Sequence, residues 1–328
     1  MGNEEKKILL LTSGGTIASK KDEKTGKVQS GVISGQKLAD LIPNRRDFSC
    51  QVEELFRLPS AHLTMFHLRE MAQAIKTVFE ENRCQGVVLT HGTDTLEETA
   101  YYLDLVLHDC GPVILTGSQL PPEEIASDAF RNLRDSFKVA LKEESRDKGV
   151  LVVFNGRIYA ASEAVKIHTD NLDAFASPGW GPIGCIDGEE VIYKRTINKR
   201  VKITPEKNRR EPKVYIISFG LGMDGYLIEK ALEAGAEGLV LEGFGRGQIP
   251  PEAVEQVERA VNKGIPVVLT TRCYEGAVKG VYDYKGSAVQ LEKIGVILAN
   301  DLPKQKARIK LMLALANDMS IKEISELF

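Results

Sequence analysis

The sequence predicts an α/β fold of two domains, a larger N-terminal one built on a mostly parallel sheet flanked by helices and a smaller C-terminal one. Three observations support this. Aliphatic runs alternate with amphipathic segments along the chain, as strands and helices do in parallel sheets. The length, 328 residues, is ample for two domains. A polar, basic segment at 193–212 interrupts the alternation and is typical of a linker.

Residues 1–192 are expected to form the N-terminal domain. Its aliphatic runs predict buried strands, and the segments between them have apolar residues near helical spacing. The expected strands are Ile8–Leu11, Gly86–Thr90, Pro112–Thr116 and Val150–Phe154. The expected helices are Leu68–Asn82, Leu96–Leu107 and Ala126–Glu143.

Residues 213–328 are expected to form a smaller, Rossmann-like or flavodoxin-like domain, because the same alternation resumes there. The expected strands are Val214–Phe219, Gly238–Glu242 and Pro266–Thr270. The expected helices are about Asp224–Ala234, Pro251–Asn262 and Pro303–Asn317.

Composition excludes several classes of partner. The formal net charge of −3 does not favour nucleic acid or an anionic membrane. The five cysteines are scattered without a C-x-x-C pair, which argues against a disulfide framework or a zinc site and suits a reducing compartment. No apolar run approaches the roughly 18 residues that span a bilayer, and the charged start has no signal-peptide pattern. We therefore expect a cytoplasmic, soluble protein.

Three segments that follow predicted strands are the candidates for a site, because ligands bind beyond the carboxyl ends of parallel strands. They are TSGGT at 12–16, THGTDT at 90–95 and TGSQLPP at 116–122. The first has three interpretations: a tight turn, a phosphate cradle, or a turn that exposes Thr16 as a nucleophile. The complete P-loop motif is absent, which weighs against the phosphate cradle.

The second segment also has a structural interpretation. Asp94 or Thr95 can cap a helix, with Glu97 or Glu98 closing a capping box. The alternative is a site for an anion or oxyanion at the helix N-terminus, formed near Thr93 and Asp94. Lys166 is most simply a solvated lysine, but near a carboxylate in a cleft it could act with Asp94 to activate a threonine.

The second domain contains a competing motif for a different function. Gly220, Gly222 and Gly225 form G-x-G-x-x-G after a predicted strand, and Glu242 ends the next strand. This arrangement is typical of a dinucleotide-binding fingerprint and would make the protein an oxidoreductase. About 115 residues leave little room for a complete dinucleotide fold with a substrate site, so the motif is more simply a structural turn.

Taken together, these motifs resemble the asparaginase/glutaminase family of two-domain amidohydrolases. The first signature stands as SGGTIA at Ser13–Ala18, and the second, HGTDT, at His91–Thr95. PVILTGSQLPP, NGRIYAASEAVKIHT and the tail KQKARIKLMLALA also resemble family segments, in the same order along the chain. The resemblance implies hydrolysis of the side-chain amide of asparagine to aspartate and ammonia, with no metal or organic cofactor.

The resemblance also implies roles for individual residues. Thr16 would be the nucleophile that forms an acyl-enzyme, and Thr93, Asp94 and Lys166 would form a hydroxyl–carboxylate–amine set that keeps Asp94 ionised and activates water. Asp94 would also bind the substrate α-amino group. The other implied substrate-binding residues are Ser60 and Ala61 for the α-carboxylate, the carbonyl of Ser118 for the amide N–H, and Gln248 reaching across from a neighbouring subunit of a homodimer or homotetramer.

One segment departs from the family pattern. Many members carry a tyrosine in the lid after the first motif, but Ser19–Gly35 contains none here, and the first tyrosine is Tyr101. The acceptor for the Thr16 proton is then the Thr93–Asp94–Lys166 set, a water molecule, or a residue of a neighbouring subunit. Glycines within the segment still allow the lid to hinge.

Overall fold

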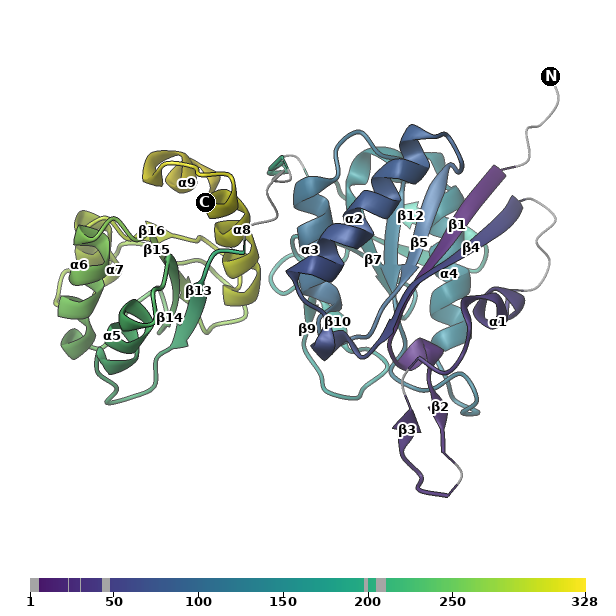
Figure 1. The fold of residues 1–328 in the computed structure, drawn as a ribbon, viewed down its shortest axis with the longest axis horizontal. Coiled ribbons are helices and arrows are strands. Elements are labelled where there is room, and N and C mark those ends of the chain that lie inside the picture. The colour runs from purple at the N-terminus through teal and green to yellow at the C-terminus, as the bar shows by residue number, and fades with distance from the viewer. Residues whose placement is uncertain (1–5, 23, 30, 43–47, 198–199, 205–210) are drawn as a thin grey trace. The chain divides into compact units, whose positions relative to one another are not determined.

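The computed structural model describes the chain except residues 1–5, 23, 30, 43–47, 198–199 and 205–210. The chain divides into two compact units, 1–202 and 203–328. Each has its own sheet (Figure 1) and its own hydrophobic core, which confirms the predicted fold class. The domain limits and the linker expected at 193–212 stay predictions, and residues 198–199 and 205–210 of that linker lie outside the described residues.

The first unit is built on an eight-stranded sheet with the order β12-β11-β8-β7-β6-β5-β1-β4. Its parallel strands are β4 (Phe48–Leu58), β1 (Lys6–Gly14), β5 (Gly86–Thr90), β6 (Val113–Thr116) and β7 (Val150–Phe154). An antiparallel extension continues through β8 (Arg157–Ala160), β11 (Gly184–Asp187) and β12 (Glu190–Tyr193). The carboxyl ends of the parallel strands therefore lie along one edge.

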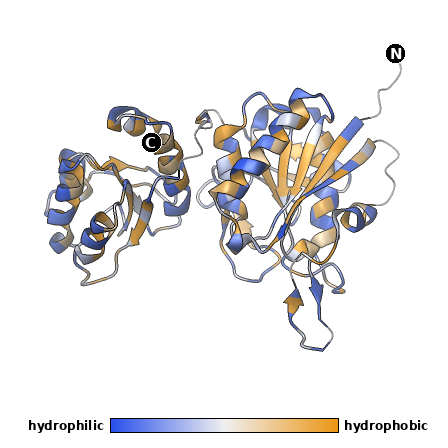
Figure 2. Cartoon of the chain, viewed as in Figure 1, coloured by the Kyte–Doolittle hydropathy of each residue, from blue (hydrophilic) through white to orange (hydrophobic). Residues whose placement is uncertain are grey.

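Helices cover both faces of this sheet. α1 (Gly35–Asp40) and α4 (Ala129–Leu141) pack on one face, and α2 (Met65–Glu80) and α3 (Leu96–Val106) lie on the other (Figure 1). Ile8 and Leu10 join the core under α1 and α4, whereas the alternate residues of β1 face the opposite helices. Because both faces are buried, the central strands are continuously apolar, as the hydropathy colouring shows (Figure 2).

Shorter elements connect the layers of the first unit. The 3₁₀ turns are η1 (Thr16–Ala18), η2 (Ser60–His62) and η3 (Glu143–Lys148). Two small hairpins pair β2 (Lys20–Lys21) with β3 (Val28–Gln29), and β9 (Val165–Lys166) with β10 (Phe175–Ala176). Each of these hairpins forms a separate two-stranded sheet.

The second unit is a smaller parallel sheet with the order β13-β14-β15-β16. Its strands are β13 (Val214–Ser218), β14 (Gly238–Gly243), β15 (Val267–Thr271) and β16 (Ile297–Leu298). α8 (Lys304–Ala316) covers one face, while α5 (Tyr226–Glu233), α6 (Val254–Asn262) and α7 (Ala288–Lys293) cover the other. The turn η4 (Pro251–Ala253) precedes α6, and α9 (Ile321–Leu327) ends the chain. Among the described helices of both units, none is long and apolar enough to cross a membrane.

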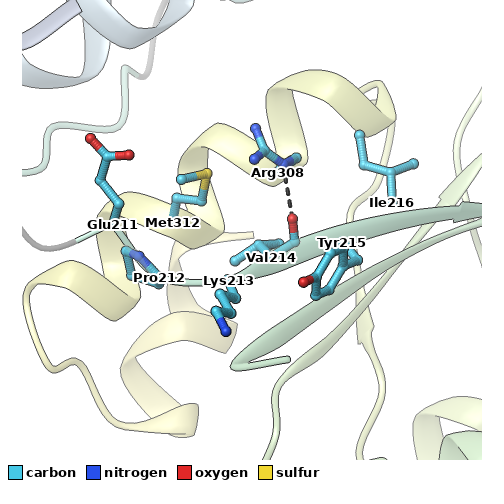
Figure 3. A pocket seen from close by; sticks show the side chains of 8 residues that line it. All are labelled: Glu211, Pro212, Lys213, Val214, Tyr215, Ile216, Arg308 and Met312. Atoms are coloured by element: carbon cyan, nitrogen blue, oxygen red, sulfur yellow. Dashed lines mark hydrogen bonds between the residues drawn. The ribbon is translucent and has the colours of Figure 1, made fainter. Parts of the chain in front are cut away.

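β13 is an edge strand of this sheet, and α8 protects part of it. Arg308 Nε donates a hydrogen bond of 2.9 Å to the Val214 carbonyl (Figure 3). A shallow cavity of about 390 Å³ lies beside this contact, with Tyr215 and Met312 in its lining. The arginine occupies a backbone acceptor that could otherwise pair with another strand.

Candidate active site

Loops that follow β1, β5 and β6 meet at the carboxyl edge of the first sheet, and glycines make the contact possible. A Cβ added to Gly15 would lie 2.4 Å from Gly92 Cα, and one added to Gly117 would lie 2.5 Å from the His91 carbonyl oxygen. Such distances exclude any side chain at these positions. The backbones of the three loops therefore touch, and Thr16 and Thr93 each follow a glycine of the first contact.

Thr16 begins η1, and only Gly15 separates it from the end of β1. Gly15 has φ +81°, a conformation that favours glycine, and its N–H donates to the Leu58 carbonyl at 3.2 Å. The Ser19 hydroxyl donates to the Gly15 carbonyl at 2.7 Å and closes the turn from the other side. Thr16 itself is only half-buried. The glycine pair thus holds the threonine on a fixed turn with part of its surface open.

Lys166 joins two of the predicted catalytic residues. Its Nζ donates to Thr93 Oγ1 at 2.8 Å and to Asp94 Oδ1 at 2.7 Å. Thr93 is 6% exposed, and the Lys166 side chain is 15% exposed. The Asp94 side chain, by contrast, is 72% exposed. The carboxylate therefore keeps an open face for a ligand while one of its oxygens is paired with the ammonium group.

His91 is a fully buried residue that supports the Thr93 loop. Its Nδ1 lies 2.7 Å from the Gly92 carbonyl, and its Nε2 lies 2.9 Å from the Thr99 hydroxyl. A neutral ring with the proton on Nδ1 satisfies both contacts, donating to the carbonyl and accepting from the hydroxyl. Burial lowers the pKa of His91 to about 4, so the ring is neutral near pH 7.

The start of α3 corrects one prediction. Thr95 is the N-cap residue, but no side chain caps the helix, so the capping box proposed for Asp94 or Thr95 with a following glutamate is wrong. The Thr95 hydroxyl instead donates to the Ser60 carbonyl at 3.0 Å. Glu97 Oε2 accepts a hydrogen bond from the Lys166 backbone N–H at 2.5 Å. Competing tertiary partners therefore replace the local capping pattern.

Ser60 and Ala61, the residues expected to bind an α-carboxylate, lie in η2 after β4. Ser60 is buried, and a Cβ added to Gly92 would lie 2.8 Å from its side chain. Ala61 is exposed. The Thr95–Ser60 hydrogen bond joins η2 to the loop of Asp94, so the structure brings this predicted contact region next to the Lys166 set.

Ser118 lies on the third loop, which is held by two buried residues that sequence reasoning missed. Asp128 accepts hydrogen bonds from the backbone N–H groups of Gln119 and Leu120, both at 3.1 Å. Asn132 Nδ2 donates to the Gly117 carbonyl at 3.0 Å and to Asp128 at 2.9 Å. A signal was present, since Asn132 interrupts the apolar stripe of α4 one residue before Leu133. Burial raises the pKa of Asp128.

The lid region forms the β2–β3 hairpin, which extends away from the main sheet (Figure 1). Lys20 and Lys21 form exposed ion pairs with Glu123 and Glu124, at 3.5 and 3.8 Å respectively. The hairpin is thus joined to the segment that follows Ser118. Exposed pairs of this kind contribute little to stability.

Gln248 belongs to the second unit of the chain, whereas Thr16, Thr93, Asp94 and Lys166 belong to the first. Its Oε1 accepts a hydrogen bond from the Ala288 N–H at 3.2 Å, at the start of α7. The contact uses the amide oxygen. Its predicted role toward a neighbouring subunit stays a prediction.

The groups that would read a dinucleotide in the second unit already have partners within the unit. The Gly220 N–H donates to Met223 Sδ at 2.9 Å, and Glu242 is paired with Lys304 Nζ at 2.8 Å. Gly222 has φ +78°, so its backbone conformation alone favours glycine. These contacts argue against a dinucleotide site. Among the described residues of the chain, no group of three or more His, Cys, Asp or Glu could hold a metal.

Comparisons with known proteins agree with this arrangement. Residues 7–199 match the family model described as Asparaginase, N-terminal, and residues 213–328 match the Glutaminase/Asparaginase C-terminal domain. An L-asparaginase of Bacillus licheniformis is 44% identical over 95% of this chain and 96% of its own length. A probable periplasmic L-asparaginase of Haemophilus influenzae is 31% identical over 98% of this chain and 92% of its own length.

A solved structure shows the same architecture across both units. A probable cytoplasmic L-asparaginase from Campylobacter jejuni matches with a TM-score of 0.88 and 33% identity, over 98% of this chain and 99% of the other. The names of these relatives differ in compartment, so they do not decide between cytoplasm and periplasm. Family models on both units and relatives along almost the whole length lead to one conclusion: the chain belongs to the asparaginase family.

Proposed function

We propose that the protein is an L-asparaginase that hydrolyses the side-chain amide of L-asparagine to L-aspartate and ammonia. The observation that carries this proposal is the Lys166 Nζ bonded to both Thr93 and Asp94, beside the Gly15–Gly92 contact that places the Thr16 turn. Family membership and the names of relatives support the substrate. No metal or organic cofactor takes part in the proposed reaction.

The first step uses Thr16 as the nucleophile. Its hydroxyl oxygen attacks the amide carbon and forms a tetrahedral intermediate, whose oxyanion accepts hydrogen bonds from backbone N–H groups near Thr16 and Thr93. Such a donor typically contributes ~3 kcal/mol to transition-state stabilisation. The C–N bond then breaks, and the proton given up by Thr16 leaves on ammonia. An ester between Thr16 and aspartate remains as the acyl-enzyme.

The second step returns the enzyme to its starting state. Water attacks the ester carbonyl with assistance from Thr93, and the proton that water loses restores the Thr16 hydroxyl when the C–O bond breaks. Lys166 keeps Asp94 ionised through their direct ion pair. The exposed face of Asp94 binds the substrate α-ammonium group, and Ser60 and Ala61 bind the α-carboxylate.

The proton transfer from Thr16 differs from a tyrosine-assisted route, because the lid segment contains no tyrosine. We assign the transfer to the Thr93–Asp94–Lys166 set with an intervening water. Gln248 and a homodimer or homotetramer complete the proposal, with the glutamine contacting a neighbouring subunit through its amide nitrogen. The oligomeric state is testable by light scattering.

The experiment is ammonia release from asparagine and from glutamine, measured with wild type, Thr16→Ala and Thr16→Ser. Thr16→Ala is expected to lose activity by about 10³-fold or more, because the hydroxyl nucleophile is gone. Thr16→Ser keeps a hydroxyl and should retain part of the activity. Thr12→Ala makes the same change on β1, four residues earlier, and serves as the control, with activity near wild type.

Mass spectrometry of quenched wild-type enzyme tests the intermediate, because the acyl-enzyme adds an aspartyl group to the peptide that contains Thr16. Ammonia release by Thr16→Ala at the wild-type rate would contradict the nucleophile. The ratio of the two substrates sets the selectivity, for which one methylene of pocket depth contributes about 1–3 kcal/mol.

A further inference from the structure

Lys166 lies on a hairpin that the main sheet does not hold. β9 contains only Val165–Lys166 and pairs with the two residues of β10, in a two-stranded sheet separate from the eight-stranded one. A hairpin this short is marginal by itself. The place of the Lys166 backbone must therefore come from contacts outside the ladder.

Glu97 supplies such a contact. It is 6% exposed and lies in the first turn of α3, and its Oε2 accepts the Lys166 backbone N–H at 2.5 Å. An ionised acceptor makes this hydrogen bond stronger than one between neutral groups. The helix fixes the carboxylate, and the carboxylate fixes the backbone from which the lysine side chain extends.

The same helix start also carries Asp94, three residues before Glu97. Asp94, one residue before the N-cap Thr95, pairs with Lys166 Nζ, and Glu97, in the first turn of α3, holds Lys166 N–H. If the Lys166 backbone shifted, its Cα would move relative to Thr93 and Asp94. The side chain would then have to change conformation to keep its contacts of 2.8 Å to Thr93 and 2.7 Å to Asp94. The two carboxylates act on opposite ends of one residue.

We infer that Glu97 is a positioning residue, which anchors the Lys166 backbone so that its ammonium group lies between Thr93 and Asp94. The inference rests on the proposed function, because it assigns Glu97 an effect on turnover. A different explanation of Glu97 is that its negative charge stabilises the N-terminus of α3. The two explanations make opposite predictions for two conservative variants.

The first variant, Glu97→Gln, removes the charge but keeps an oxygen at the same reach. The second, Glu97→Asp, keeps the charge but withdraws the oxygen by one methylene. Positioning predicts that Glu97→Gln keeps kcat within about threefold, whereas Glu97→Asp lowers it by about 10- to 100-fold, because misplacement by about 1 Å at a catalytic group costs this much. KM should change by less than about threefold in both, because Asp94 still offers its open face to substrate. If the charge at the helix end is what matters, Glu97→Gln should lower kcat and Glu97→Asp should keep it.

Amide hydrogen exchange gives a readout that does not depend on activity. Exchange at the Lys166 amide should be faster in Glu97→Asp than in wild type and should stay near wild type in Glu97→Gln. Glu98→Gln removes the neighbouring charge on the same helix turn and is the matched control, expected to change neither kcat nor this exchange. Wild-type kcat in Glu97→Asp, or equal losses in both Glu97 variants, would overturn the inference.

A third variant separates this inference from the proposed function. Lys166→Met removes the ammonium group itself and should lower kcat by at least as much as Glu97→Asp. If Lys166→Met keeps wild-type activity, the proposed function fails. If Lys166→Met loses activity while Glu97→Asp does not, the proposed function stands and the role of Glu97 is wrong.

Discussion

Both units place a lysine between a hydroxyl and a carboxylate at the ends of parallel strands, but the exposure of the charges is reversed. In the first unit the Lys166 side chain is 15% exposed and Asp94 is 72% exposed. In the second, Lys304 Nζ contacts Ser218 at 3.2 Å and Glu242 at 2.8 Å, and the lysine is 37% exposed and the glutamate 15%. The first arrangement leaves an open acid for a ligand, whereas the second joins α8 to the strand ends.

The glycines of the two units also differ, in how closely another part of the chain approaches them. Gly15 and Gly222 both have a positive φ, +81° and +78° respectively. An added Cβ at Gly15 would meet Gly92 at 2.4 Å, whereas one at Gly222 would meet nothing within 4 Å. The contact at Gly15 brings the loops of the first unit together, whereas Gly222 makes no such contact with another backbone. The two glycine motifs look alike in the sequence, and only the packing around them distinguishes them.

The largest expected effect tests the two carboxylates. Asp94→Asn should lower kcat/KM for asparagine by about 10³-fold, because it removes both the partner of Lys166 and the charge proposed to bind the α-ammonium group. Glu242→Gln should stay within about twofold in activity and lose at most ~1 kcal/mol of unfolding free energy, as expected for a partly exposed pair. Steady-state kinetics and urea denaturation measure both. Equal kinetic losses in the two variants would contradict the contrast between the units.

The next effect concerns acid stability, since all the histidines of the chain precede residue 169 and the second unit has none. His91 has a pKa of about 4 in the fold and an ordinary value of 6.5 when unfolded. Protonation of His91 therefore favours the unfolded state. The stability that comes from burying the neutral ring is fully present above pH 6.5 and is lost as pH falls to 4. The first unit should lose about 3 kcal/mol over this range from His91 alone.

His91→Asn is the variant that tests this slope, because it keeps a donor near the Gly92 carbonyl without a group that titrates there. Urea denaturation of the first unit at several pH values between 4 and 7 measures the difference. Wild type and variant should converge toward acid pH. Parallel pH dependences would show that His91 does not control acid stability.

The smallest effect is the difference in cost between substitutions at the two glycines. Gly15→Ala and Gly222→Ala both place a side chain at a positive φ, which costs about 1–3 kcal/mol. Gly15→Ala also forces the touching loops apart, which should add about 2 kcal/mol of destabilisation and displace Thr16. Each variant is compared with the wild-type transition of its own unit, and ammonia release should fall only in Gly15→Ala. The same cost in both variants would mean that the Gly92 contact is not tight.

Much of the fold could be predicted from the sequence because the central strands are short apolar runs. The predicted limits of β5 and β7 agree with the structure, and those of the other predicted strands differ by a few residues. β4 was missed, because this edge strand has alternating polar residues and no continuous apolar run. The antiparallel extension β8–β11–β12 was missed for a related reason, since each of its strands contains a charged residue and none is a continuous aliphatic run.

The site was less accessible to sequence reasoning than the fold. Thr16, Thr93, Asp94 and Lys166 were identified from motifs, and their roles stay proposals. Glu97 or Glu98 was interpreted as closing a local capping box, because local pattern gives no information about a partner that lies 69 residues further along the chain from Glu97. The hydrogen bonds of Asp128 and Asn132 to the Ser118 loop likewise depend on where α4 packs, and the only local signal for them is the polar Asn132 within the apolar stripe of that helix.

The contacts of Lys166 have a consequence for synthesis and folding. Its ammonium group meets partners 73 and 72 residues earlier in the chain, so the site closes through long loops whose entropy must first be overcome. A nascent chain that has not yet reached the β9 hairpin can form β1 and β5 but cannot complete this set. Contacts between distant parts of a chain form slowly. Ammonia release should therefore appear late in folding. Recovery of turnover then shows that the tertiary contacts of the first unit have formed, and not only its secondary structure.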